Sequence, residues 1–107
     1  MIELAKEHPH EYPKGSPALA AEEVAELIPL APDWTVSDGS LDRTFTFKDF
    51  HEAFSFLTRV ALLAEAEGHH PDMSCSWNRV DFSFWTHTVD GLTRNDFIMA
   101  AKIDRFS

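Results

Sequence analysis

The sequence has little cysteine and no long apolar run. Its 107 residues include one cysteine, Cys75, which can form neither an intramolecular disulfide nor a four-cysteine metal site, and which suits a reducing cytoplasm. No apolar stretch approaches the length that spans a membrane. The first 16 residues contain acidic residues, histidines and prolines without an apolar centre, so we expect no signal peptide and a cytoplasmic protein.

Basic residues are also scarce. The chain has nine Lys and Arg residues and 18 Asp and Glu residues, which gives a formal net charge of -9. This charge repels phosphate backbones, and the basic residues are scattered, so direct nucleic-acid binding is not expected. Hydrophobic residues make up 44% of the chain, which is typical of a globular protein and excludes a disordered one.

The first half of the chain predicts an arm, a helix and a hairpin. Pro9, Pro13 and Gly15 interrupt any periodicity, so residues 1–16 are interpreted as an extended arm and residues 17–107 as a single domain. Ser16 and Pro17 are suited to open a helix, which Pro29 to Pro32 would end. Residues 34–36 and 41–47 then predict two strands around an Asp-Gly turn.

An amphipathic helix is predicted from Phe50 to the C-cap position at Gly68, with Asp49 and Glu52 resembling a capping box at its start. Phe56 and Leu63 lie off its main apolar stripe, so the apolar arc is wider than one sheet would cover, and we expect at least a dimer. The stripe expected to be buried consists of Phe50, Ala53, Phe54, Leu57, Val60, Ala61 and Ala64.

A second hairpin and a last helix complete the pattern. Residues 73–77 and 80–87 predict two strands that turn near Asn78 and Arg79. Thr93 is the predicted N-cap of the final helix, with Asp96 at its third position as the capping partner. The order helix, two strands, helix, two strands, helix indicates an α+β fold with an antiparallel or mixed sheet and helices on one face.

Three of the six histidines fall within 19 residues: His69, His70 and His87. Imidazole titrates near neutral pH, so these groups can donate and accept protons. His69 and His70 follow the long helix, and His87 ends a predicted strand, so all three lie at the ends of rigid elements, where binding groups are often found. A histidine at a helix end is also commonly a solvated charge partner, and spacing alone does not decide between these interpretations.

A zinc site is the competing chemical interpretation of this cluster. It would need a further ligand such as Cys75 or Asp72, and the sequence contains no HExxH or CxxC spacing. No motif supports a Ser-His-Asp or Cys-His nucleophile. We therefore predict no metal.

The histidines belong to a longer pattern, Glu65-x3-His69-His70-Pro71-x5-Trp77-x9-His87-x8-Asp96. It resembles the signature of the pterin-4a-carbinolamine dehydratases, also called dimerisation cofactors of a homeodomain transcription factor. The resemblance continues upstream through FKDF, AFSF and TRVALLAE, covers roughly residues 19–106, and leaves the arm unexplained. It implies a four-stranded antiparallel sheet with three helices on one face, in dimers or tetramers.

The resemblance also implies the site. His69, His70 and His87 match the catalytic histidines, and Thr93 and Asp96 are kept as the structural cap. Gly68 stands where some relatives carry an acid, and Val89 where some carry a cysteine. The positions expected to contact substrate are Glu65, Pro71, Thr86, Thr88 and Val89.

The implied activity is that of a hydro-lyase, 4a-hydroxytetrahydrobiopterin dehydratase, which acts in tetrahydrobiopterin recycling. Removing water from the carbinolamine requires that the C4a hydroxyl receives a proton and that N5 loses one. Imidazoles can donate the first proton and accept the second without a cofactor. Implied partners are the pterin substrate, further copies of the chain, and an aromatic amino acid hydroxylase as supplier. The alternative is a non-enzymatic dimerisation, assembly or coactivator module, which would have no need of the three histidines.

Overall fold

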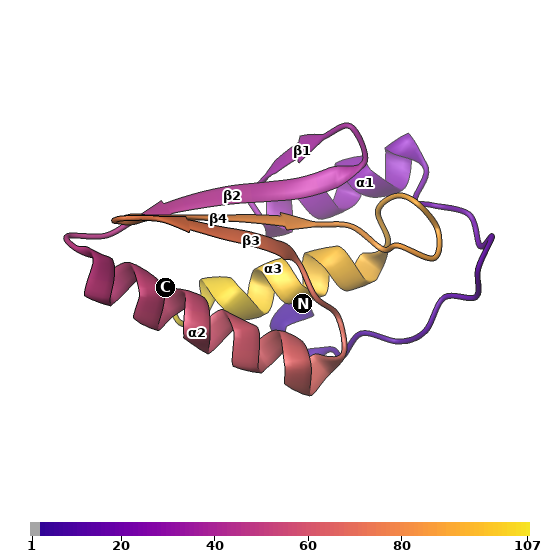
Figure 1. Cartoon of the computed structure of the whole chain (residues 1–107). Helices are drawn as coiled ribbons and strands as arrows, with labels where there is room; N and C mark the ends of the chain where they lie inside the picture. The colour runs from indigo at the N-terminus through magenta and orange to yellow at the C-terminus, as the bar shows by residue number, and fades with distance from the viewer. Residues whose placement is uncertain (1–2) are drawn as a thin grey trace.

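A four-stranded antiparallel sheet in the order β1-β2-β4-β3 forms one layer of the protein, and three α-helices cover one of its faces (Figure 1). The computed structural model describes residues 3–107. This arrangement confirms the predicted α+β fold and its order of elements. The elements are η1 (Leu4–Lys6), α1 (Ala21–Leu27), η2 (Ile28–Leu30), β1 (Thr35–Ser37), β2 (Ser40–Thr46), α2 (Phe50–Glu67), β3 (Asp72–Ser76), β4 (Arg79–Phe84) and α3 (Arg94–Asp104).

The core lies between β4 and the helices. Alternate residues of β4, namely Val80, Phe82 and Phe84, are buried, as expected for a strand with one covered face. The pairing of β2 with β4 sets Leu41 opposite Phe84 and Phe45 opposite Val80. Burying one such side chain contributes about 1.5–3 kcal/mol, so this face anchors the loop that follows β4.

The two hairpins differ slightly from the sequence prediction. The first turns at Asp38 and Gly39, as expected, and both have a positive φ. The second turns at Trp77 and Asn78, one residue earlier than predicted, because Ser76 pairs with Arg79. The prediction that the last strand reaches His87 was wrong, since β4 ends at Phe84.

The first helix begins later than predicted. Ser16 is not its N-cap: its hydroxyl donates to the Pro13 carbonyl, and α1 starts only at Ala21. The intervening residues belong to no helix or strand, and the Leu19 N–H donates to the Leu92 carbonyl. This tertiary hydrogen bond outweighs the local signal of Ser16 and Pro17.

The buried face of α2 is rotated relative to the predicted stripe. Phe56 was expected to lie off the stripe but is buried, whereas Phe50 and Phe54 are 49% and 48% exposed. Phe56 packs against Phe45 with 4.7 Å between ring centroids, which turns the neighbouring phenylalanines towards solvent. The residues of α2 that are buried are Ala53, Phe56, Val60 and Ala64.

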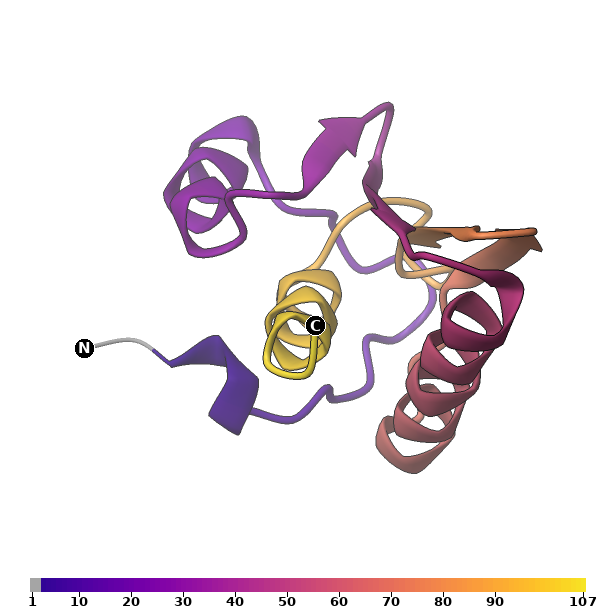
Figure 2. The same ribbon diagram turned by 90° about the vertical axis from the view of Figure 1, so that its left-hand side faces the viewer.

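Helix α3 is buried on most of its sides. Figure 2 shows it between α1 and α2, with the N-terminal arm beneath it. The arm begins with η1, whose Leu4 is buried, and η1 packs against α3. Within residues 3–107, no helix has both the length and the apolar character needed to cross a membrane.

Candidate active site

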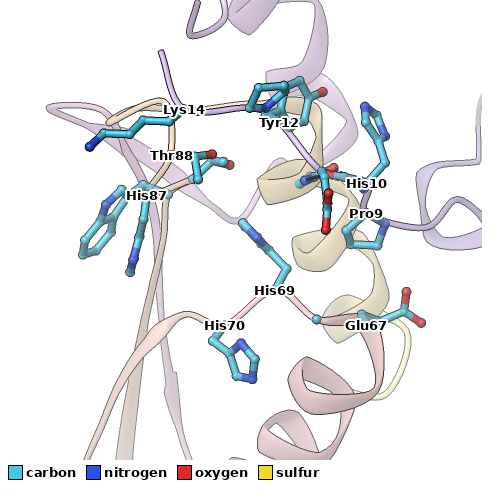
Figure 3. Close-up of a pocket in the computed structure, with 15 residues that line it drawn as sticks. Pro9, His10, Tyr12, Lys14, Glu67, His69, His70, His87 and Thr88 are labelled. Carbon is cyan, nitrogen blue, oxygen red and sulfur yellow. Dashed lines mark hydrogen bonds between the residues drawn. The ribbon is translucent and has the colours of Figure 1, made fainter. Parts of the chain in front are cut away.

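A cavity of about 820 Å³ opens between the C-terminal end of α2, the loop after β4 and the N-terminal arm (Figure 3). His69, His70 and His87 all line it. The sequence separates His70 from His87 by a complete hairpin, and the antiparallel pairing of β3 with β4 brings the two ends together. The predicted convergence of the three histidines on one cavity is therefore observed.

His69 is positioned by the end of α2. Gly68 is in the left-handed conformation with φ 71° and caps the helix, and both its N–H and that of His69 donate to the Ala64 carbonyl. The imidazole then packs parallel to the Phe84 ring, with 5.9 Å between centroids. Its side chain is only 12% exposed, so His69 enters the cavity from a fixed position.

Asp96 holds the His69 ring. Asp96 is fully buried at the third position of α3, where one carboxylate oxygen accepts from the Thr93 N–H at 2.9 Å and from the Thr86 hydroxyl at 3.0 Å. These bonds confirm the predicted cap of Thr93 and Asp96. The other oxygen lies 2.6 Å from His69 Nε2, a contact that the sequence analysis did not foresee.

This contact defines the His69 tautomer. While Asp96 is ionised its oxygens can only accept hydrogen bonds, so Nε2 of His69 carries the hydrogen in this contact. In the neutral ring, Nδ1 is then an acceptor. Within the described residues it has no hydrogen-bond partner, which leaves this nitrogen available to take a proton.

His70 lies at the rim of the cavity. Its Nε2 is 2.8 Å from Glu65 Oε1, and both side chains are more than half exposed. Figure 3 shows the His70 ring turned away from the His69 ring. His70 is therefore in contact with solvent, and the buried carboxylate serves His69 alone.

His87 stands opposite His69 on a tight loop. The Thr86 N–H donates to the Gly91 carbonyl at 2.8 Å, which closes the loop at its base and presents His87 and Thr88 (Figure 3). The His87 ring packs against Trp85, with 4.6 Å between centroids. Its imidazole is exposed and, within residues 3–107, forms no side-chain hydrogen bond.

Only some of the other residues predicted to contact substrate line the cavity. Thr86 and Thr88 line the cavity, although the Thr86 hydroxyl is already bonded to Asp96 and Thr93. Glu65, Pro71 and Val89 are outside its lining. Their contacts with substrate stay predictions.

One wall of the cavity was not predicted from the sequence. Residues 9–14 of the arm line it, together with Glu67, Trp85 and Asn95. The arm has no periodic pattern, so its docking depends on tertiary contacts that a sequence does not display. No group of three His, Cys, Asp or Glu side chains suited to a metal ion occurs in the described part of the chain.

Side-chain contacts hold the arm beside the cavity. Both carboxylate oxygens of Glu7 accept from the Arg94 guanidinium at 2.7 Å. The hydrogen bond from Arg94 holds the pKa of Glu7 below its usual value, against the opposing effect of desolvation. Glu67, at the end of α2, is 2.9 Å from His8 of the arm.

Comparison with known proteins agrees with this geometry. A profile of the family described as pterin 4 alpha carbinolamine dehydratase matches residues 17–106. A relative from Chlorobium limicola named for this dehydratase is 54% identical over 92 residues, which are 82% of this chain and 80% of the relative. One from Rubrobacter xylanophilus, named likewise, is 43% identical over 106 residues, which cover 98% and 99% of the two chains.

Solved structures show the same fold. A transcriptional coactivator/pterin dehydratase from Brucella melitensis superposes with a TM-score of 0.77 at 37% identity, over 82% of this chain and 96% of that one. A pterin dehydratase-like RuBisCO assembly factor of the alpha-carboxysome has a TM-score of 0.56 at 22% identity, over 67% and 83%, which shows the fold alone. The profile match across most of the chain and the close relatives are decisive: the protein belongs to the pterin-4a-carbinolamine dehydratase family.

Proposed function

We propose that this protein dehydrates 4a-hydroxytetrahydrobiopterin to the quinonoid dihydropterin by histidine acid-base catalysis. In this reaction the C4a–O bond breaks and the hydroxyl leaves as water after receiving a proton. The N5–H electron pair forms the C4a=N5 bond, and the N5 proton passes to a base. Atoms and charges balance without an oxidant or a metal, so the proposed reaction needs no cofactor.

The observation that supports this proposal most strongly is the pairing of His69 with the buried carboxylate of Asp96 on one side of the cavity, opposite a solvated His87. His69 Nδ1 is a suitable acceptor for the N5 proton, and Asp96 stabilises the positive charge that then forms on the ring. His87 is suited to protonate the leaving hydroxyl. Because His87 and His70 are exposed, exchange with solvent can restore their protons between turnovers.

Single histidine variants test these roles. The substrate is 4a-hydroxytetrahydrobiopterin, generated freshly and followed as it converts to the quinonoid product. His69→Ala and His87→Ala should lower kcat by about 10²–10⁴-fold, and the exposed His70→Ala should have a smaller effect. His51→Ala is the matched control, because His51 lies on α2 outside the cavity. Equal effects of all four substitutions would contradict the assignment.

We also propose that the protein works in the cytoplasm as a homo-oligomer, dimer or tetramer, on pterin supplied by an aromatic amino acid hydroxylase. Phe50, Phe54 and Leu62 expose apolar surface along α2, and β3 is an edge strand whose outer side has no partner in the described chain. A second copy would cover either surface. The net charge of -9 supports a role without direct nucleic-acid binding.

A further inference from the structure

The N-terminal arm is built into the cavity wall at several points along its length. Leu4 is buried, and Lys102 of α3 donates to the Ala5 carbonyl at 2.9 Å. Glu7 is bound by Arg94 through two hydrogen bonds. At the far end, the Gly15 N–H donates to the Thr88 carbonyl at 3.1 Å, so the arm is attached directly to the loop that carries His87.

The contacts of Asn95 are the strongest indication that the arm binds the domain at a defined position. This residue of α3 is 3% exposed and forms two hydrogen bonds with the backbone of His10. Its amide nitrogen donates to the His10 carbonyl at 2.7 Å, and its amide oxygen accepts from the His10 N–H at 3.1 Å. These two bonds satisfy the side-chain amide of Asn95 and fix the position of the His10 backbone on α3. Asn95 also lines the cavity, so the arm docks on the cavity wall itself.

Lys14 occupies a particular place in this wall. It precedes Gly15, which is bonded to the His87 loop, and Figure 3 shows its side chain extending past Thr88 on the side of His87. Lys14 lines the cavity, and its ammonium group forms no hydrogen bond or ion pair within residues 3–107. A side chain with a free three-proton donor therefore lines the same cavity as the histidine that is proposed to protonate the substrate.

The chemistry of the pterin places its side chain in the same region. The reacting atoms C4a and N5 must lie within reach of both His69 and His87, and C6 is bonded directly to N5. A substituent at C6 therefore leaves the ring next to the reacting atoms. In a biopterin this substituent carries two hydroxyl groups, which accept hydrogen bonds.

We propose that the arm is a specificity element, in which Lys14 binds the hydroxylated side chain at C6 of the pterin. The inference rests on the proposed function for the identity of the substrate. The arm lies outside residues 17–106, which match the family profile, so this contact is carried by the arm and not by the matched domain. Lys14 here binds substrate and takes no part in proton transfer.

The test compares two stable ligands, 7,8-dihydrobiopterin and 7,8-dihydro-6-methylpterin, which differ only at C6. Their Kd values are measured by calorimetry on the full chain for wild type, Lys14→Ala and Lys14→Arg. The matched control is Lys6→Ala, because Lys6 belongs to the same arm but pairs with Glu3 away from the cavity. None of these side chains is buried, so the fold should be retained, which circular dichroism verifies.

Lys14→Ala should raise the Kd of dihydrobiopterin about two- to tenfold, the loss expected for one hydrogen bond, and leave that of the 6-methyl ligand unchanged. Lys14→Arg should restore much of the difference, and Lys6→Ala should match wild type. Equal weakening of both ligands, or no change for either, would overturn the proposal. Binding does not depend on turnover, so a protein that binds these ligands with the predicted selectivity but dehydrates nothing would refute only the proposed function.

Discussion

Replacing Asp96 with asparagine should separate its catalytic role from its structural one. The asparagine oxygen can take the place of the oxygen that accepts from the Thr93 N–H and the Thr86 hydroxyl. Its NH₂ group then faces His69, where the second carboxylate oxygen lies 2.6 Å from Nε2. Because an NH₂ group only donates, Nε2 must become the acceptor and the hydrogen moves to Nδ1. The nitrogen proposed as the base is lost while the helix cap is kept.

The expected magnitudes differ between asparagine and alanine. Asp96→Ala removes the capping-box partner of Thr93 and leaves the buried Thr93 N–H without an acceptor. Loss of a cap costs about 0.5–2 kcal/mol and an unsatisfied buried donor about 1–3 kcal/mol. Both figures concern the same N–H, so the free energy of unfolding should fall by about 1–3 kcal/mol. Asp96→Asn keeps that bond and should cost less than about 1 kcal/mol.

Activity should not follow this order. Both substitutions should lower kcat by about 10²–10⁴-fold, the usual contribution of a general acid or base. The assays are urea unfolding and turnover of freshly made 4a-hydroxytetrahydrobiopterin, on the same preparations. An Asp96→Asn protein with wild-type kcat would refute the tautomer argument, and one that is as unstable as Asp96→Ala would refute the assignment of the cap.

Further predictions concern the core, assembly and the arm. Phe56→Ala should lower the free energy of unfolding by about 3–5 kcal/mol. Phe54→Ala lies on the exposed face of the same helix and should mainly weaken self-association. Equal losses of stability in the two variants would contradict the orientation of α2. Light scattering at micromolar concentration should give a mass above the 12.1 kDa of one chain, and a monomeric mass that persists on concentration would refute the oligomer. The pKa of Glu7 is lowered by Arg94, so the pair stabilises the fold fully above the unfolded pKa of about 4.3 and loses this effect as the pH falls through the lower folded pKa. In urea unfolding, Glu7→Gln should therefore lower the free energy of unfolding by up to about 1 kcal/mol at pH 7, given the exposure of the pair, and should not change it at pH 2. A loss of stability that does not depend on pH would count against the charge pairing.

The fold could be predicted largely because its local signals agree with its tertiary structure. The alternation from Val80 to Phe84, the Asp38-Gly39 turn and the Thr93–Asp96 cap each specify one conformation by local physics, and the structure shows all three. The predictions were wrong where a contact with a residue distant in the sequence determines the local conformation. The Leu19 N–H is bonded to the Leu92 carbonyl, and Phe56 packs against Phe45. Neither contact is visible in the local sequence.

The candidate site was predictable in its residues but not in its geometry. The spacing from Glu65 to Asp96 identified the histidines, and the structure adds that Asp96 bonds to His69 while His70 turns to Glu65. The wall formed by residues 9–14 was not predictable, because the buried amide of Asn95 and the Arg94–Glu7 pair join segments more than 80 residues apart. The signal that linked Asp96 to the histidines was its place at the end of the family pattern.

The central claim is that the three histidines of this cavity catalyse loss of water from a pterin-4a-carbinolamine. The most direct measurement is the rate of dehydration of freshly generated 4a-hydroxytetrahydrobiopterin with wild-type protein, with a folded His69→Ala, His70→Ala, His87→Ala triple variant, and with buffer alone. We predict that wild type accelerates the reaction well above the spontaneous rate and that the triple variant retains at most about 1% of this acceleration. A triple variant as active as wild type, or a wild-type rate equal to that in buffer, would contradict the account.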